Sequence, residues 1–251
     1  MRDVSMSYNF EGHSFKALDT FNLSIEKGEF VSIIGPSGCG KSTLFSIVSG
    51  LVRPTEGSVE VDGKTIDGPR PDKIAVVLQE VSLFPWRNVM KNVEFGMEIV
   101  GIPQKQREAT ALNLLKLLGL QGFEMKYPQQ LSGGMRQRVS IARALAMNTE
   151  LLLMDEPFGA LDEQTRRIMG EELLKIWSTT RKTVLFVTHS LEEAVMLSDR
   201  IVVMSARPGR ILDIVKVDMS RPRKPASMQF SSLKEDLWNL LRTESMKSLA
   251  T

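Results

Sequence analysis

A glycine-rich stretch at residues 35–43 constrains the fold of this chain more than any other feature. It matches the pattern G-x-x-x-x-G-K-[ST] and follows the apolar run Phe30–Ile34. A helix-compatible run, from Ser42 to Ser49, comes next. The order strand, glycine loop, helix turns backbone N–H groups toward phosphate oxygens at a helix N-terminus, so it predicts a phosphate-binding loop. The loop consists of Gly35, Pro36, Ser37, Gly38, Cys39, Gly40, Lys41, Ser42 and Thr43.

Three side chains of this loop have expected roles. Lys41 would reach the β- and γ-phosphates, and Ser42 would supply a hydroxyl to Mg²⁺. Cys39 occupies a position that requires a small side chain. Because a phosphate-binding dipole favours thiolate, we expect Cys39 to be reactive when the site is empty. Alkylation of this thiol would then block ATP binding, and ATP would protect it.

Composition excludes several classes of protein. The net charge of +2 argues neither for nor against a nucleic-acid groove, and no dense block of Lys and Arg appears before the C-terminal tail. The single cysteine excludes an intrachain disulfide framework and a Cys-based structural zinc site. Met1 leads into a polar, strand-like run rather than a signal peptide. No apolar run approaches the ~20 residues needed to span a bilayer, so in a membrane process another chain must do the spanning.

Patterns along the chain predict a core with an insert. Roughly the first 65 residues mix hairpin-like strands with the strand before the glycine loop, which predicts an antiparallel β subdomain. Helical periodicity replaces strand-like runs at about 81–148, so we expect a helical subdomain inserted there. One nucleotide-binding domain is assigned to residues 1–220. Residues 221–251 are assigned to a basic, proline-marked linker and an amphipathic helix.

A pair of acids follows the apolar run 151–154. A buried strand that ends at Asp155 and Glu156 delivers both carboxylates to the C-terminal edge of a sheet, where nucleotides bind. Asp155 can hold Mg²⁺, and Glu156 is placed to polarise an attacking water. The alternative is a strand that ends in a solvated acidic turn. The glycine-rich loop in the same chain favours the catalytic interpretation.

A second anion-binding helix terminus is predicted at Ser132, Gly133 and Gly134, within the run 131–138. In this context the run resembles the signature sequence of ABC ATPases. Other motifs resemble the same family in its order along the chain, from Val4 to about Val217. They are Tyr8 at the A-loop aromatic, Gln79 at the Q-loop, Gly159, Ala160, Leu161 and Asp162 at the D-loop, and His189 at the switch histidine.

This resemblance implies an α/β fold of the P-loop NTPase class, with an ABC ATPase core, an antiparallel β subdomain and an inserted helical subdomain. It implies ATP and Mg²⁺ as cofactors and ATP hydrolysis as the activity. It implies a head-to-tail homodimer in which Ser132 and Gly134 of one copy close over ATP held by the other. The resemblance assigns catalysis to Glu156, His189 and Gln79, and the metal to Ser42, Gln79 and Asp155. The remaining nucleotide contacts would come from Tyr8, the glycine-rich loop, Gly133 and Asp162.

Within the family, the chain resembles importer ATPases of the nitrate/sulfonate/taurine type. The supporting residues are the runs 83–87, 131–138 with Met135, 155–162 and 205–210. This resemblance implies integral membrane permease subunits as partners and, indirectly, a periplasmic or surface solute-binding protein. It implies a peripheral position at the cytoplasmic face of the inner membrane. A small anion or an organosulfonate-like solute is the expected cargo, and no nucleic acid is expected as a partner. The patch at residues 83–86 is either lobe core or a docking surface for the permease.

Two other functions remain open from the sequence. One is a soluble ABC ATPase in DNA repair or translation, and the other is the ATPase of an exporter or lipid-trafficking system. DNA-repair types need long coiled-coil arms, whereas about 90 residues without sustained heptads separate Lys41 from Ser132. The chain departs from the family pattern at its first strand, which begins several residues late, and at Leu78, where Phe is commoner.

Overall fold

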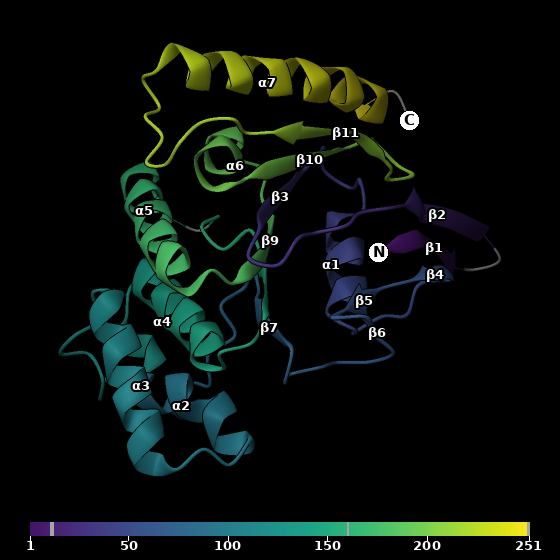
Figure 1. Cartoon of the computed structure of the whole chain (residues 1–251). Coiled ribbons are helices and arrows are strands. Elements are labelled where there is room, and N and C mark those ends of the chain that lie inside the picture. The colour runs from purple at the N-terminus through teal and green to yellow at the C-terminus, as the bar shows by residue number, and fades with distance from the viewer. Residues whose placement is uncertain (11–12, 160, 250–251) are drawn as a thin grey trace. The chain divides into compact units, whose positions relative to one another are not determined.

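The computed structural model describes residues 1–10, 13–159 and 161–249 (Figure 1). The chain divides into two compact units. The first consists of Met1–Arg70 with Lys182–Thr251, and the second of Pro71–Arg181.

A mixed sheet forms the centre of the first unit, with strands in the order β11-β10-β3-β9. β3 pairs in parallel with both β10 and β9, and β10 pairs antiparallel with β11. All five residues of β3 are buried, as expected for a strand covered on both faces. The strands are β3 (Phe30–Ile34), β9 (Thr183–Val187), β10 (Arg200–Met204) and β11 (Ile211–Lys216).

An antiparallel sheet in the order β2-β1-β4 accounts for the predicted β subdomain. β1 pairs antiparallel with both neighbours, and the register shifts along each of the two ladders. The alternation at residues 17–25 predicts a strand over that range, but β2 ends at Phe21. Thr20, the second-last residue of β2, has a φ of 49°, which departs from extended backbone just before the strand ends. The strands are β1 (Arg2–Phe10), β2 (His13–Phe21) and β4 (Glu56–Ser58), with a hairpin of β5 (Glu60–Val61) and β6 (Lys64–Thr65).

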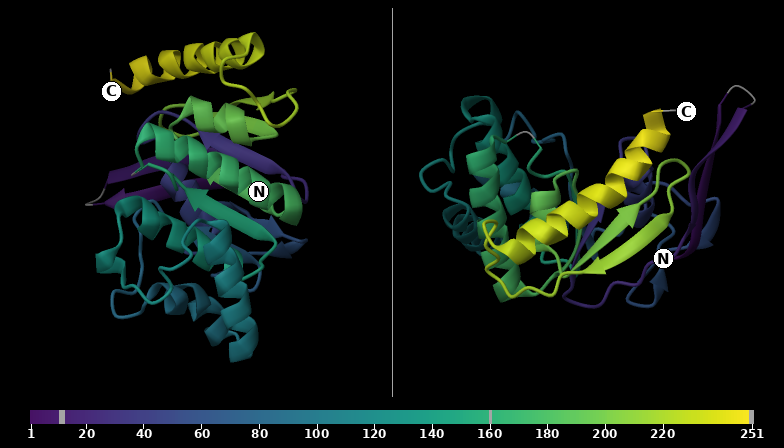
Figure 2. Two further views of the ribbon diagram at one scale, coloured as in Figure 1. Left: turned by 90° about the vertical axis from the view of Figure 1, so that its left-hand side faces the viewer. Right: turned by 90° about the horizontal axis from the view of Figure 1, so that it is seen from above.

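Three helices complete the first unit. α1 follows β3, and α6 follows β9. α7 packs against α6 and β10 and runs along β10 and β11 (Figures 1 and 2). The helices are α1 (Lys41–Val48), α6 (Leu191–Leu197) and α7 (Met228–Leu249).

The segment predicted as a basic linker is tied to the C-terminal end of α6. Arg221 Nη2 donates to Leu197 O at 2.6 Å. Arg223 Nη1 donates to Val195 O at 2.8 Å and to Ser198 O at 2.6 Å. Burial lowers the pKa of Arg223 to about 10, so the side chain remains a cation at neutral pH. Two arginines therefore satisfy carbonyls that have no partner within the helix.

The second unit holds a parallel strand pair, β7 and β8, and the helices between and after them. α2, α3 and α4 lie within residues 89–146, inside the range expected for the helical insert. None of the helices in the described part of the chain is long and apolar enough to cross a membrane. The elements are β7 (Ile74–Val77), α2 (Val89–Ile99), α3 (Gln104–Leu117), the 3-10 helix η1 (Pro128–Gln130), α4 (Gly133–Ala146), β8 (Leu151–Asp155) and α5 (Glu163–Thr180).

Candidate nucleotide-binding and hydrolysis site

The glycine-rich loop joins the C-terminal end of β3 to the N-terminus of α1, as the sequence predicts. Gly40 is the N-cap of α1 and has a φ of 101°, in the left-handed region. A Cβ at this position would lie 2.8 Å from Leu18 Cδ2, so only glycine fits. The helix carries no side-chain cap and no acidic residue in its first turn. Its N-terminal N–H groups and dipole are thus suited to an anion.

The Lys41 side chain folds back over the loop. Its ammonium donates to Gly35 O at 2.8 Å and to Pro36 O at 2.9 Å. The two carbonyls hold the Lys41 ammonium at the loop, where it could contact a bound phosphate group. Ser42, next to it in the first turn of α1, is exposed and presents its hydroxyl at the same helix end.

The expectation of a reactive Cys39 thiol is wrong. The residue is only 1% exposed. Burial raises the pKa of the Cys39 thiol, and this outweighs the nearby ammonium of Lys41, whose Nζ lies 3.7 Å from Sγ. A protonated, covered thiol is a poor nucleophile, so Cys39 acts as a small packing residue beneath the loop.

The parallel register of β3 and β9 brings His189 beside the glycine-rich loop. Ile33 pairs with Val187, and two residues further along each strand are Gly35 and His189. His189 is exposed at this edge of the sheet. In the sequence, Ser190 with Glu193 three residues later predicts a helix N-cap. The structure confirms it, since Ser190 caps α6 by accepting a hydrogen bond from Glu193 N at 3.3 Å. The first unit therefore holds the phosphate loop and the histidine together.

Tyr8 belongs to an aromatic pair that the sequence did not reveal. It is paired with Phe15 across β1 and β2, and the two rings stack with centroids 5.4 Å apart and planes at 29°. Phe15 is 41% exposed. Cross-strand aromatic neighbours of this kind offer a flat apolar surface. The pairing of Phe15 with Tyr8 depends on the register of the β1–β2 hairpin, which the sequence alone does not determine.

In the second unit, Gln79 meets the acidic pair. β7 and β8 are parallel, with Val77 opposite Met154, so the residues that follow both strands lie side by side. The Gln79 amide donates from Nε2 to Glu156 Oε2 at 3.2 Å. The sequence predicted roles for both residues, and this hydrogen bond brings them together.

Glu156 also has an unusual backbone. Its φ is 43°, in the left-handed region. This conformation costs a non-glycine residue free energy, and residues that adopt it cluster at functional sites. Gly159 N donates to Glu156 O at 3.0 Å, which closes the turn after β8. Asp155 and Glu156 are both half-buried.

The donors predicted for the metal are all oxygens. They are the hydroxyl of Ser42 in the first unit, and the amide of Gln79 and the carboxylate of Asp155 in the second. This chemistry suits Mg²⁺, which takes few protein ligands and retains waters. Among the described residues, no group of three or more His, Cys, Asp or Glu is arranged to hold a metal ion. Hydroxyl, amide and carboxylate oxygens fit an Mg²⁺ ion that is bound together with phosphate.

The signature residues open α4 as expected. Ser132 is the N-cap and accepts from Met135 N at 3.3 Å. Gly133 and Gly134 form the first positions of the helix, and its first turn contains no acid. Ser132 and Gly133 are exposed. This terminus can therefore receive an anion from outside the unit.

Asp162 is the N-cap of α5. Its carboxylate accepts from Thr165 N at 2.9 Å, and this hydrogen bonding lowers the pKa of Asp162. Ala160, in the same predicted D-loop, lies outside the described residues.

An exposed aromatic cluster lies at the patch predicted as core or docking surface. Trp86 is 72% exposed, and its ring centroid lies 5.6 Å from that of Phe84. Phe84 in turn contacts Phe95 at 4.4 Å, and Arg143 lies over the Phe84 ring. Fully buried Asn92 holds the segment, since its amide donates to the carbonyls of residues 84, 87 and 88.

Comparisons with known proteins identify the family of this chain. The family model described as ABC transporter matches residues 18–159. An uncharacterized ABC transporter ATP-binding protein of Methanocaldococcus jannaschii is 53% identical over 249 residues, covering 99% of this chain and 93% of that protein. The taurine import ATP-binding protein TauB of Escherichia coli K12 is 48% identical over 220 residues, covering 88% of this chain and 86% of TauB.

Solved structures are similar as well. The ATP-binding cassette MJ0796, in a dimeric post-hydrolysis state bound to ADP and Pi, superposes with a TM-score of 0.79. It is 35% identical, and the match covers 87% of this chain and 98% of the cassette. The chain therefore belongs to the ABC transporter family and is an ATP-binding, ATP-hydrolysing member of it.

Proposed function

We propose that this chain is the ATPase subunit of an importer and that Glu156 activates the water that attacks ATP. The hydrogen bond from Gln79 to Glu156 carries the catalytic assignment, because it fixes the carboxylate at the end of β8. His189 and Lys41 would meet the γ-phosphate, and the N-terminus of α1 would hold the phosphate chain. When bound, Mg²⁺ would neutralise phosphate charge beside Ser42, Gln79 and Asp155.

A second copy of the chain would complete the site. The N-terminus of α4, capped by Ser132, is exposed and is suited to an anion. We propose that Ser132, Gly133 and Gly134 of one copy close over ATP held by the other, with Asp162 near the contact. The dimeric MJ0796 cassette bound to ADP and Pi supports this arrangement. ATP binding would close the dimer, and hydrolysis would release it.

The membrane partner would bind the aromatic cluster around Trp86. A mostly exposed tryptophan, in a segment whose backbone is held by a fully buried asparagine, is typical of an interface anchor. Because Gln79 lies a few residues before this cluster, nucleotide state and docking could be coupled through one segment. We propose integral permease subunits as the partner, which would place the chain at the cytoplasmic face of the inner membrane. A solute-binding protein would deliver cargo to the permease.

The similarity to taurine import proteins supports import and suggests the class of solute. A small anion or an organosulfonate is the proposed cargo. The permease and the binding protein would select it. Uptake of labelled taurine by vesicles that contain the chain with its co-purified permease tests this. ATP-dependent efflux instead of uptake would refute the importer assignment.

The catalytic assignment is tested with the purified chain and Glu156→Gln. We expect hydrolysis to fall at least 100-fold, the lower end for loss of a general base. ATP binding should persist, and saturating MgATP should trap a dimer in size-exclusion chromatography. Glu163→Gln, an exposed acid in the first turn of α5, is the matched control. A Glu156→Gln variant that hydrolyses ATP normally, or that stays monomeric with MgATP, would contradict the assignment.

A further inference from the structure

The loop after β10, residues 205–210, is fixed against the nucleotide-binding region of the first unit. Gly209 N donates to Ala17 O at 2.9 Å, and Asp19 N donates to Gly209 O at 3.0 Å. A Cβ at Gly209 would lie 2.1 Å from Cys39 O, so the backbone at Gly209 packs directly against the backbone of the glycine-rich loop. The loop thus contacts both β2 and the glycine-rich loop.

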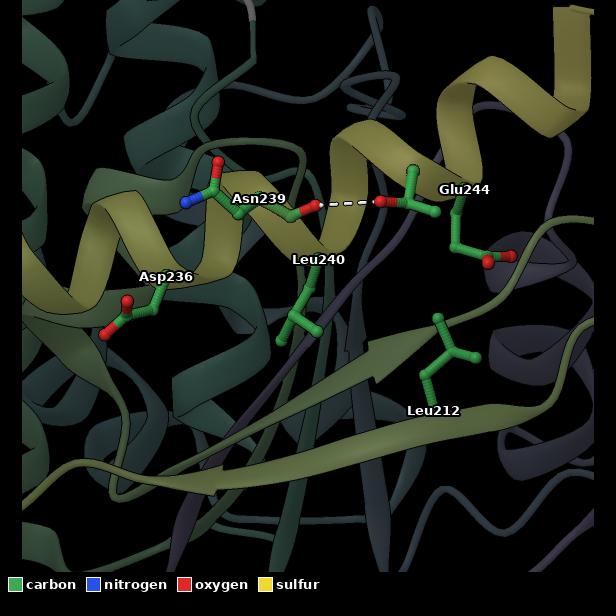
Figure 3. A pocket seen from close by; sticks show the side chains of 6 residues that line it. Leu212, Asp236, Asn239, Leu240 and Glu244 are labelled. Carbon is green, nitrogen blue, oxygen red and sulfur yellow. Dashed lines mark hydrogen bonds between the residues drawn. The ribbon is translucent and has the colours of Figure 1, made fainter.

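The C-terminal helix holds the same loop from the other side. Ala206 N donates to Glu244 Oε2 at 2.9 Å, and Glu244 is only 5% exposed. Figure 3 shows Glu244 projecting from α7 next to Leu212 of β11; both residues line a cavity of about 610 Å³. The backbone on the N-terminal side of Arg207 is therefore also anchored.

The guanidinium of Arg207 lies between two parts of the candidate site. Its Nε donates to Gly38 O at 3.4 Å, and its Cζ lies 5.2 Å from the centroid of the Phe15 ring. Phe15 stacks on Tyr8. The cation thus connects the aromatic pair with the glycine-rich loop.

Arg207 differs from its neighbour Arg210 in its partners. Arg210 Nε donates to Asp19 Oδ2 at 2.8 Å, which neutralises it. Arg207 is exposed and forms no ion pair with any described residue. An uncompensated guanidinium against an aromatic face is well placed to bind a phosphate, since it has five planar donors.

We propose that Arg207 is a nucleotide-binding residue whose guanidinium contacts the α-phosphate of ATP and ADP. This inference rests on the proposed site, in which Tyr8 stacks on adenine and residues 35–43 hold the β- and γ-phosphates. The ribose and α-phosphate lie between base and β-phosphate, and Arg207 bridges the same two protein elements. Because the α-phosphate is present in both nucleotides and does not react, Arg207 contributes to affinity and not to the chemical step.

Calorimetric titration with MgADP and with a non-hydrolysable MgATP analogue tests the proposal. Arg207→Ala is expected to raise Kd about tenfold for both nucleotides, which is about 1.4 kcal/mol. In steady-state hydrolysis, KM should rise while kcat stays within twofold. Arg207→Lys keeps the charge but loses the planar donors, so an intermediate loss is expected. Arg210→Ala removes the same charge from the same loop and is the matched control, with Kd expected within twofold of the wild type.

Three results would overturn the proposal. They are an Arg207→Ala Kd within twofold of the wild type, a loss for the ATP analogue without a loss for ADP, and an equal loss in Arg210→Ala. Thermal unfolding of each variant checks that it is folded. If Arg207→Ala does not fold, the Kd of Arg207→Lys tests the proposal in its place. Failure of the proposed function has a different signature, because the wild-type chain itself would then neither bind nor hydrolyse ATP.

Discussion

Arg223→Met removes the cation that caps α6 and should destabilise the first unit. The side chain donates to five backbone carbonyls, those of Val195, Met196, Ser198, Val217 and Met219. The first three lie at the C-terminal end of α6, where carbonyls have no helical partner. All three residues are buried, so water replaces the lost donor poorly.

Two opposing effects set the size of the loss. Each buried acceptor left without a donor costs about 1–3 kcal/mol. Burial of the cation is itself unfavourable, as the lowered pKa of Arg223 records, and methionine removes that cost. We therefore expect the free energy of unfolding to fall by about 3 kcal/mol, which corresponds to about 1 kcal/mol for each of the three carbonyls left without a donor. For a chain of this size, this lowers Tm by roughly 6–12 °C.

Thermal unfolding followed by circular dichroism measures this loss. Lys224→Met is the matched control, because it removes a neighbouring charge that is exposed. Its Tm should stay within about 2 °C of the wild type. If Arg223→Met also shifts Tm by less than 2 °C, or both variants lose equally, Arg223 does not cap the helix.

Three further predictions concern other buried groups. Asn92→Leu removes three donated hydrogen bonds and should lower the free energy of unfolding in urea by about 2–4 kcal/mol; an unchanged midpoint would contradict the role given to Asn92. Burial raises the pKa of the Cys39 thiol, so maleimide labelling of the native chain should be at least tenfold slower at pH 7 than labelling of the urea-unfolded chain. Labelling of the native chain should accelerate as the pH rises toward that pKa. Equal labelling rates for the native and unfolded chains would show an accessible thiolate. Glu244→Gln weakens the anchor of the 205–210 loop and should raise the Kd for MgADP about threefold, whereas exposed Asp236→Asn, from the same cavity, should not.

Local sequence patterns were sufficient where one segment determines the geometry. The glycine-rich loop, the acids after β8 and the Ser190 cap each depend on a few consecutive residues, and the structure contains all three. The hydrogen bond between Gln79 and Glu156 then follows from two strands that pair in parallel. The family resemblance, confirmed by the comparisons, supplied the order of these motifs.

Long-range partners could not be predicted in the same way. Arg221 and Arg223 look like part of a solvated linker, because their acceptors lie more than twenty residues earlier, in α6. The position of Arg207 depends on the hairpin register at Phe15 and on α7. For Cys39, the helix dipole suggests a lowered thiol pKa, but burial raises that pKa and has the larger effect. Only the packing of the folded chain reveals this burial.

We propose that each ATP site is completed by a second copy of the chain. Lys41→Ala disables the glycine-rich loop, and Ser132→Arg obstructs the N-terminus of α4. Each variant alone should hydrolyse ATP at less than about 1% of the wild-type rate, as expected for loss of a principal phosphate-stabilising group. In a mixed dimer, one site combines the intact loop of one chain with the intact α4 terminus of the other. Mixing the two inactive variants should therefore restore hydrolysis to a substantial fraction of the wild-type rate. A mixture as inactive as its components, under conditions where the two chains are shown to associate, would contradict a site shared between copies.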